Sequence, residues 1–371
     1  MHRRARPRRG HIPYWLLAAS IAAAVAAVLP IAFAVIGGVG GKGVPSRAFA
    51  SAPPGLVVVG VRSTATEDVI VTAPVNDMSS IREVARVPHL PGYISSGAIS
   101  PDGSMAAVIS ADGGTPAAPT ASLFVVTIAS GELRRVVTGI DQLQTATWSR
   151  DGAALFLTRS SASGPLVDVE VLRAAANGSD VTTVATFGRV LGAYPLGETP
   201  SGALLVVLID GRGSTVVRSD GSTIATLGDG ITRDWKLSPD GTQVAFIETA
   251  LSGGVQYHQR VTRLDGAASP GAAAAQSAVR GEQLGVAWAP KGSAPTFGQE
   301  PGSSSAGVAA QSNARGFDVP LAYSPEGTFL AVQAWSGSSF QAPGEMRYEA
   351  VAADGGREEI PFTRFFGWAS R

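Results

Sequence analysis

The chain has 371 residues, 29 lysines and arginines balanced by 29 aspartates and glutamates, and no cysteine. The lack of cysteine excludes disulfides, thiolate metal sites, cysteine nucleophiles and lipid-modified cysteine. Five arginines lie within the first ten residues, and the rest of the chain carries 24 basic and 29 acidic residues, which argues against the basic surface that nucleic-acid binding needs.

The first hydrophobic segment, residues 12–36, contains 25 residues without a charge. A helix of this length would extend about 37 Å, enough to cross a hydrocarbon core of about 30 Å. The sequence therefore predicts a transmembrane signal-anchor helix at 12–36 that contacts the lipid bilayer. By the positive-inside rule the basic tail, residues 1–11, stays in the cytoplasm and the rest of the chain lies outside it, anchored as a single-pass protein.

A cleaved signal peptide is the alternative for this segment, because Ala48-Phe49-Ala50 has the small-x-small pattern of a cleavage site. The apolar run is longer than the 7–15 residues usual in signal peptides, and the candidate site lies well beyond its end, so retention is favoured. Residues 37–54 are rich in Gly, Pro, Ser and Ala and are predicted to form a flexible linker.

A short pattern then recurs along the chain, with the form Ser-Pro-Asp-Gly followed by an apolar strand. The glycines of its six copies are 49, 50, 39, 51 and 35 residues apart, a period typical of propellers and solenoids. The copies are AISPDGSMAAVIS (98–110), TWSRDGAALFLT (147–158), ETPSGALLVVLI (198–209), KLSPDGTQVAFIE (236–248), AWAPKGSAPTF (287–297) and AYSPEGTFLAVQA (322–334).

Each copy predicts a tight turn between two strands. Proline fixes φ at the second position of the turn, the carboxylate bonds to the local backbone, and glycine accepts a positive φ. Most copies are followed 20 to 30 residues later by a hairpin signal, so each unit predicts a four-stranded antiparallel blade. These hairpin signals are Ser130-Gly131, Asn177-Gly178, Asp220-Gly221, Asp265-Gly266 and Asp354-Gly355.

The turn residues are the candidate sites of the sequence, and we interpret them as structural. The carboxylates belong to different units at equivalent turns, so they should not converge on one metal ion. Four tryptophans that precede the turns, Trp148, Trp235, Trp288 and Trp368, are predicted to pack in the core. The predicted turn residues are Asp102, Gly103, Asp151, Gly152, Gly202, Asp240, Gly241, Gly292, Glu326 and Gly327.

The repeat resembles that of bacterial TolB-like β-propellers, and it also occurs in the propeller domains of prolyl-oligopeptidase-type peptidases. The resemblance is carried by the W/L-S-P-D-G pattern, with near-ideal copies at Ser100–Gly103 and Ser238–Gly241, and covers about Leu56–Arg371. It implies an all-β propeller at residues 55–371, a WD40-like repeat fold, and it implies no particular function. TolB-like relatives suggest protein contacts in the cell envelope.

The period favours seven blades. Six is the alternative, because residues 292–313 are poor in strand signals and are then interpreted as a loop insertion. Residues 267–278 are also predicted to form a surface loop. The C-terminal segment Phe365–Ser370 is predicted to lie beside the first blade and close the ring, which removes two exposed sheet edges.

The sequence contains no motif that indicates catalysis, a cofactor or a metal. No G-x-S-x-G elbow is present, and beyond the N-terminal segment the histidines are His89, interpreted as a surface residue, and His258, interpreted as structural. The favoured function is an interaction module that binds an envelope protein or glycan. The alternatives are a lyase or lactone hydrolase with its site in the central channel, and an accessory to a separate hydrolase or transporter.

Overall fold

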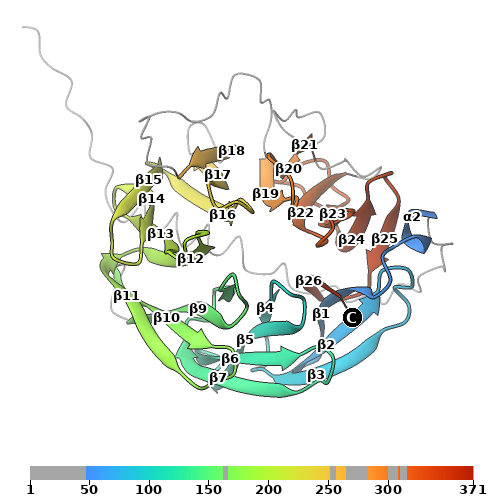
Figure 1. The fold of residues 1–371 in the computed structure, drawn as a ribbon, viewed down its shortest axis with the longest axis horizontal. Coiled ribbons are helices and arrows are strands. Elements are labelled where there is room, and N and C mark those ends of the chain that lie inside the picture. Colours follow the sequence, from blue (N-terminus) through green and yellow to red (C-terminus); the bar gives the residue numbers. More distant parts are fainter. Residues whose placement is uncertain are drawn as a thin grey trace, which may run out of the picture. The chain divides into compact units, whose positions relative to one another are not determined.

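The structure is a computed structural model that describes residues 47–161, 166–250, 256–264, 283–299, 308–309 and 316–370. These residues form seven sheets and one short helix, α2 (Arg47–Ala50), which confirms the prediction of an all-β propeller (Figure 1). The sheets belong to one compact unit, Pro45–Arg371.

Several predictions fall on residues that the structure does not describe. These are the basic tail 1–11, the membrane helix 12–36, the linker up to residue 46, the hairpin at Asp265-Gly266 and the loop 267–278. Within the described ranges, no helix has the length and apolar character needed to cross a bilayer.

We number the sheets 1 to 7 along the chain and give their strands from the innermost outward. Sheet 1 has β26 (Arg364–Ser370), β1 (Leu56–Ser63), β2 (Glu67–Pro74) and β3 (Arg82–Pro88); sheet 2 has β4 (Ser96–Ile99), β5 (Met105–Thr115), β6 (Ala118–Thr127) and β7 (Leu133–Ile140). Sheet 3 has β8 (Thr147–Trp148), β9 (Ala154–Ser161), β10 (Val167–Ala175) and β11 (Val181–Val190); sheet 4 has β12 (Gly192–Glu198), β13 (Leu204–Asp210), β14 (Gly213–Arg218) and β15 (Thr223–Gly228). Sheet 5 has β16 (Ile231–Leu237), β17 (Gln243–Ala250) and β18 (Gln256–Arg263); sheet 6 has β19 (Gln283–Trp288), β20 (Pro295–Gln299) and β21 (Val308–Ala309); sheet 7 has β22 (Phe317–Tyr323), β23 (Phe329–Trp335), β24 (Met346–Ala352) and β25 (Arg357–Ile360).

The innermost strands form a closed ring in the order β26, β4, β8, β12, β16, β19, β22 and back to β26, each in contact with the next. The C-terminal strand β26 pairs antiparallel with β1, from Leu56 opposite Ser370 to Val61 opposite Arg364. The two ends of the unit therefore share sheet 1, as predicted, and β26 covers the inner edge of β1.

Six of the seven sheets are wholly antiparallel and correspond to regular blades. Sheet 6 is irregular, because β20 pairs with the two-residue strand β21 in parallel. Within the described residues the structure thus has six regular blades, the alternative count, and an irregular seventh sheet in the region where the repeat is weakest. Residues 292–299 were predicted to be poor in strand, yet Pro295–Gln299 forms β20, so that part of the loop prediction is wrong.

Burial follows the position of each strand in its sheet. The second strands are apolar over most of their length and buried on both faces, as in β1 and β13, because a blade is covered by a neighbour on each side. The outermost strands β3 and β7 are mostly exposed or half-buried and carry charges. Hydrophobic burial between sheets therefore stabilises the ring.

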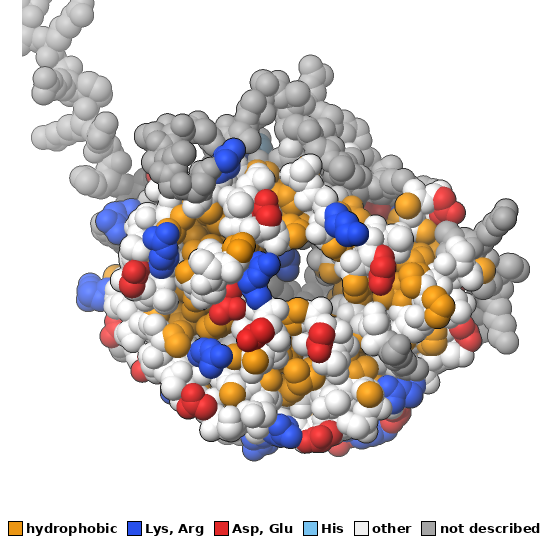
Figure 2. Space-filling view, in the orientation of Figure 1, with side chains coloured by type: hydrophobic (Ala, Val, Ile, Leu, Met, Phe, Trp, Pro, Cys, Tyr) orange, Lys and Arg blue, Asp and Glu red, His pale blue; other side chains and the backbone are white. Residues whose placement is uncertain are grey.

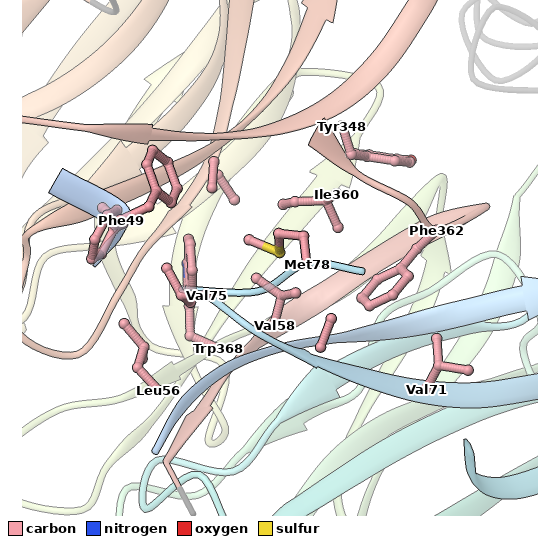
Figure 3. Packing of buried hydrophobic residues seen from close by; sticks show 14 of the residues in the cluster. Phe49, Leu56, Val58, Val71, Val75, Met78, Tyr348, Ile360, Phe362 and Trp368 are labelled. Atoms are coloured by element: carbon pink, nitrogen blue, oxygen red, sulfur yellow. The ribbon is translucent and has the colours of Figure 1, made fainter. Parts of the chain in front are cut away.

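Helix α2 adds a residue to this core that the sequence did not indicate. Phe49 is fully buried, its ring centroid lies 5.2 Å from that of Phe329, and it belongs to the cluster that contains Leu56, Met78 and Trp368 (Figure 3). Residues 37–54 were predicted to be a linker with little to bury, and for Phe49 this is wrong. The propeller unit begins before residue 55.

Candidate functional site

The predicted repeat turns lie at the inner ends of the sheets, between the innermost and second strands. In all six, the backbone N–H of the glycine donates to the carbonyl three residues before it, at 2.8 to 3.0 Å. Gly103, Gly152, Gly202, Gly241 and Gly327 have positive φ, as a turn of this kind requires. Gly292 makes the same turn hydrogen bond but does not have the positive φ that was predicted for the turn glycine.

The carboxylates in these turns serve the turns themselves. Ser100, Ser149 and Ser238 each donate an Oγ hydrogen bond of 2.6 Å to the aspartate two residues later. These bonds, with backbone N–H donors, lower the pKa of Asp102, Asp151 and Asp240. Each carboxylate is therefore bound to its own loop.

The tryptophans that precede the turns connect neighbouring sheets. The indole Nε1–H of Trp148 donates to Ala98 O at 3.1 Å, that of Trp288 to Lys236 O at 3.0 Å, and that of Trp368 to Ala322 O at 3.0 Å. The donor and acceptor lie on the innermost strands of adjacent sheets in all three.

Trp235 departs from this pattern. Its indole donates to Thr232 Oγ1 within its own strand, and its ring lies 5.1 Å from Tyr194 of sheet 4. The side chain is half-buried and still packs between sheets 4 and 5.

A buried polar group lies between sheets 1 and 2. Asp68 is fully buried and accepts the backbone N–H of Ser95 at 2.6 Å and the hydroxyl of Ser63. His89 Nε2 lies 3.6 Å from the Asp68 carboxylate and 3.5 Å from Ser63 Oγ, and its Nδ1 bonds to Leu90 O. His89 was predicted to be a surface residue, and this is wrong because only 6% of it is exposed.

The Ser63–Asp68–His89 group has the residue types of a hydrolytic triad but not its order of hydrogen bonds. Ser63 Oγ donates to the aspartate, and His89 Nδ1 faces a backbone carbonyl, so the histidine is not oriented by the carboxylate as a general base requires. The group is buried and joins the end of β3 to the start of β4. We interpret it as structural.

The innermost strand of sheet 5 places unusual residues near the axis of the ring. Its pairing with β17 is interrupted between Arg233 and Lys236, and Asp234 in this bulge has φ of 56°. Trp235 and Leu237 pack toward sheet 4, so Lys236 lies on the other side of the strand, where it is exposed.

Lys236 is exposed at its surface, yet protein atoms around it desolvate the ammonium. Desolvation lowers the pKa of Lys236, and the nearby Asp234 carboxylate acts in the opposite direction. An exposed side chain with many protein neighbours is typical of a concave position such as the wall or mouth of a channel.

Arg150 connects three sheets across this region. It lies in the turn of sheet 3, its backbone N–H donates to Glu198 Oε2 of sheet 4 at 2.8 Å, and its Nη1 lies 3.5 Å from Pro239 O of sheet 5. Because sheets 3 and 5 are not neighbours, the side chain must pass over the inner end of sheet 4. Figure 2 shows Lys, Arg, Asp and Glu side chains at the rim of a central opening.

We call Arg150, Glu198, Asp234 and Lys236 the axial cluster. It combines two exposed cations with two half-buried carboxylates from three sheets. Sequence patterns did not reveal it, since the four residues are not periodic. The only sequence signal is that Arg150 replaces the proline of the repeat and Lys236 lies two residues before the repeat serine.

A separate cavity of about 270 Å³ lies between sheets 2 and 3. Its two charged side chains neutralise one another, because Arg134 Nη2 lies 2.6 Å from Glu132 Oε1. The cavity is therefore a weaker candidate for binding a charged ligand than the axial cluster. Its lining residues are Met105, Val125, Thr127, Glu132, Arg134, Gly152, Ala153, Ala176 and Asn177.

Comparisons with known proteins identify the fold. No protein-family model matches the sequence, and no curated protein matches it. Among solved structures, the chain is similar to TolB from Acinetobacter baumannii, with TM-score 0.50 and 16% identity over 88% of this chain and 68% of that one. It is also similar to a prolyl endopeptidase, with TM-score 0.50 and 12% identity over 85% of this chain and 50% of that one.

These similarities establish a TolB-like β-propeller fold and nothing more specific. The chain spans half the length of the endopeptidase, and both identities are low. Function has to be argued from the site.

Proposed function

We propose that the chain is a membrane-tethered β-propeller that lies outside the cytoplasm and binds a protein or glycan partner at its axial face. The tether rests on the uncharged segment 12–36 and the arginines before it. The binding role rests on the axial cluster, in which the exposed cations Arg150 and Lys236 lie on the innermost part of a ring of sheets. Loops and strand ends on a rigid scaffold are common positions for recognition residues.

The location can be tested with single cysteines, because the chain has none of its own. Leu143 is 66% exposed, so Leu143→Cys should react with a membrane-impermeant maleimide in intact cells. Ala5→Cys, in the basic tail, should react only after the cells are permeabilised. Labelling of residue 5 but not residue 143 in intact cells would reverse the proposed orientation.

The binding face can be tested by photo-crosslinking in intact cells. Ser201 is exposed in the turn of sheet 4, which lies between sheets 3 and 5. Val181 is exposed on the outermost strand β11 of sheet 3. We expect a reproducible adduct of defined mass from position 201 and none from position 181. Identical adduct patterns at the two positions, or none at either, would contradict binding at the axial face.

An enzyme with its site in the central channel, of the lyase or lactone hydrolase type, is the second candidate. It is favoured by the desolvated Lys236 beside Asp234, since perturbed titratable groups in a concave site are typical of active sites. The enzyme would be supported over a binding module if the chain turned over an acidic glycan or a lactone and if Lys236→Met abolished this turnover.

A further inference from the structure

We propose that Arg150 and Lys236 bind a carboxylate at the mouth of the central opening. This proposal rests on the function proposed above and specifies the chemistry of its ligand.

Both cations lie on the innermost part of their sheets. Lys236 is exposed although it lies on an innermost strand, and Trp235 and Leu237 occupy the side that packs on sheet 4. Arg150 reaches from sheet 3 to Pro239 of sheet 5, and Pro239 lies three residues after Lys236. Both residues therefore lie near the inner turn of sheet 5, where Pro239 is.

Arg150 and Lys236 both have side-chain hydrogen-bond donors available for a ligand. Arg150 carries five N–H groups, and its guanidinium makes one long contact, at 3.5 Å, with a backbone carbonyl. Within the described ranges neither Arg150 nor Lys236 has a carboxylate within ion-pair distance of its side chain.

The acids of the axial cluster are bound by other groups. Glu198 accepts the backbone N–H of Arg150 at 2.8 Å, and Asp234 accepts the backbone N–H of Gly285 at 3.2 Å and contacts Arg233 at 3.3 Å. These contacts hold the carboxylates in place and leave the cations available.

A carboxylate fits this arrangement better than a neutral ligand. The planar guanidinium binds both oxygens of a carboxylate, and the ammonium adds a point charge. Desolvation lowers the pKa of Lys236, and an anion bound beside the ammonium would favour its charged form. A free small carboxylate and the chain end of a peptide offer the same group.

The test is isothermal titration of the full chain in detergent with three probes. These are citrate, a short peptide with a free C-terminal carboxylate, and the same peptide as its C-terminal amide. We expect the free carboxylate probes to bind more tightly than the amide. Citrate binding without peptide binding would support the site and indicate that its ligand is a small carboxylate and not the chain end of a peptide.

The variants Arg150→Met and Lys236→Met should each weaken carboxylate binding about tenfold, while Lys236→Arg should retain most of it. Lys291→Met is the matched control, because Lys291 is an exposed lysine in the turn of sheet 6. Melting temperatures of all variants should match that of the wild type, since both cations are exposed. Equal binding of the carboxylate and amide probes would overturn the proposal. Unchanged carboxylate binding in the double variant Arg150→Met, Lys236→Met would also overturn it.

The two proposals can fail separately. Carboxylate binding without an adduct at position 201 in cells would support the site and contradict the macromolecular partner. An adduct at position 201 with no carboxylate binding would support the partner and overturn the site chemistry.

Discussion

The indole Nε1–H of Trp148 donates a hydrogen bond of 3.1 Å to the carbonyl of Ala98, and this bond joins the innermost strands of two adjacent sheets. Trp288 and Trp368 make the equivalent bond, at 3.0 Å, to the preceding sheets. The tryptophan before the repeat turn thus packs in the core and also links one sheet to the next by a hydrogen bond.

We expect Trp148→Phe to lower the free energy of unfolding by about 1–2 kcal/mol, because it removes one donor and leaves a carbonyl without its partner. Trp288→Phe should have a similar effect, and the two should add because they link different pairs of sheets. Chemical denaturation of the single and double variants measures this. Val181→Ala, on the exposed outer strand, is the control and should change stability by less than about 0.5 kcal/mol.

The periodic part of this architecture was predictable from the sequence. Turn glycines, the strands after them and the tryptophans before them recur at intervals of 35 to 51 residues, and each copy follows local rules of turn and strand formation. Ring closure by Phe365–Ser370 was also predictable, because a lone strand at the end of a propeller needs the first sheet as its partner.

Contacts that occur only once were not predictable. Phe49 meets Phe329 across 280 residues of sequence, and Arg150 meets Pro239 across 89. His89 was misjudged for the same reason, since its burial depends on Asp68 from another strand. Such contacts are fixed by the assembled ring and leave no period in the sequence.

Phe49 leads to a prediction about the N-terminal segment. Phe49→Ala should lower the free energy of unfolding by about 3–5 kcal/mol, because it removes a fully buried ring that packs on Phe329 and Trp368. Leu133→Ala is the control, because Leu133 is 37% exposed and should tolerate truncation. Thermal unfolding of both variants would show the contrast, and equal melting temperatures would argue against a core role for Phe49.

The same burial bears on processing at Ala48-Phe49-Ala50. Cleavage after Ala50 would remove Phe49 from the core, so we expect the chain from cell membranes to retain this residue. Intact-mass analysis of the purified chain measures this directly. A mature N-terminus at Ser51 would contradict retention of the anchor.

Arg357 and Asp318 give a prediction about a buried ion pair. Arg357 donates two hydrogen bonds of 2.9 Å to Asp318, which is 2% exposed, and its Nε lies 2.6 Å from Glu349. Arg357→Leu should cost about 3–5 kcal/mol, because it removes the guanidinium charge beside the buried Asp318 carboxylate. The double variant Arg357→Leu with Asp318→Asn should recover part of this loss in a double-mutant cycle, whereas additive losses would indicate no coupling.

The turn carboxylates predict how stability responds to acid. Hydrogen bonds, first from the repeat serine and then from the backbone, lower the pKa of Asp102, Asp151 and Asp240 in the folded chain. In the unfolded chain these groups titrate near the ordinary value of about 3.9, so below that pH the unfolded state binds more protons. Their contribution is therefore present above about pH 4 and is lost as the pH falls through the lowered pKa values.

Sheet 4 provides a neutral control for this effect, because its turn has Thr199 and Ser201 in place of Ser and Asp, with 2.9 Å between their hydroxyls. The triple variant Asp102→Asn, Asp151→Asn, Asp240→Asn should melt at a temperature that depends less on pH between about 5 and 3 than that of the wild type. Ser201→Ala should shift the melting temperature by the same amount at every pH, since no titratable group changes. In the triple variant the change of melting temperature with pH should be smaller but not zero, because hydrogen bonds also lower the pKa of Asp77 and Asp220. If the melting temperatures of the wild type and the triple variant fall equally with pH across this range, the turn carboxylates do not cause the loss of stability in acid.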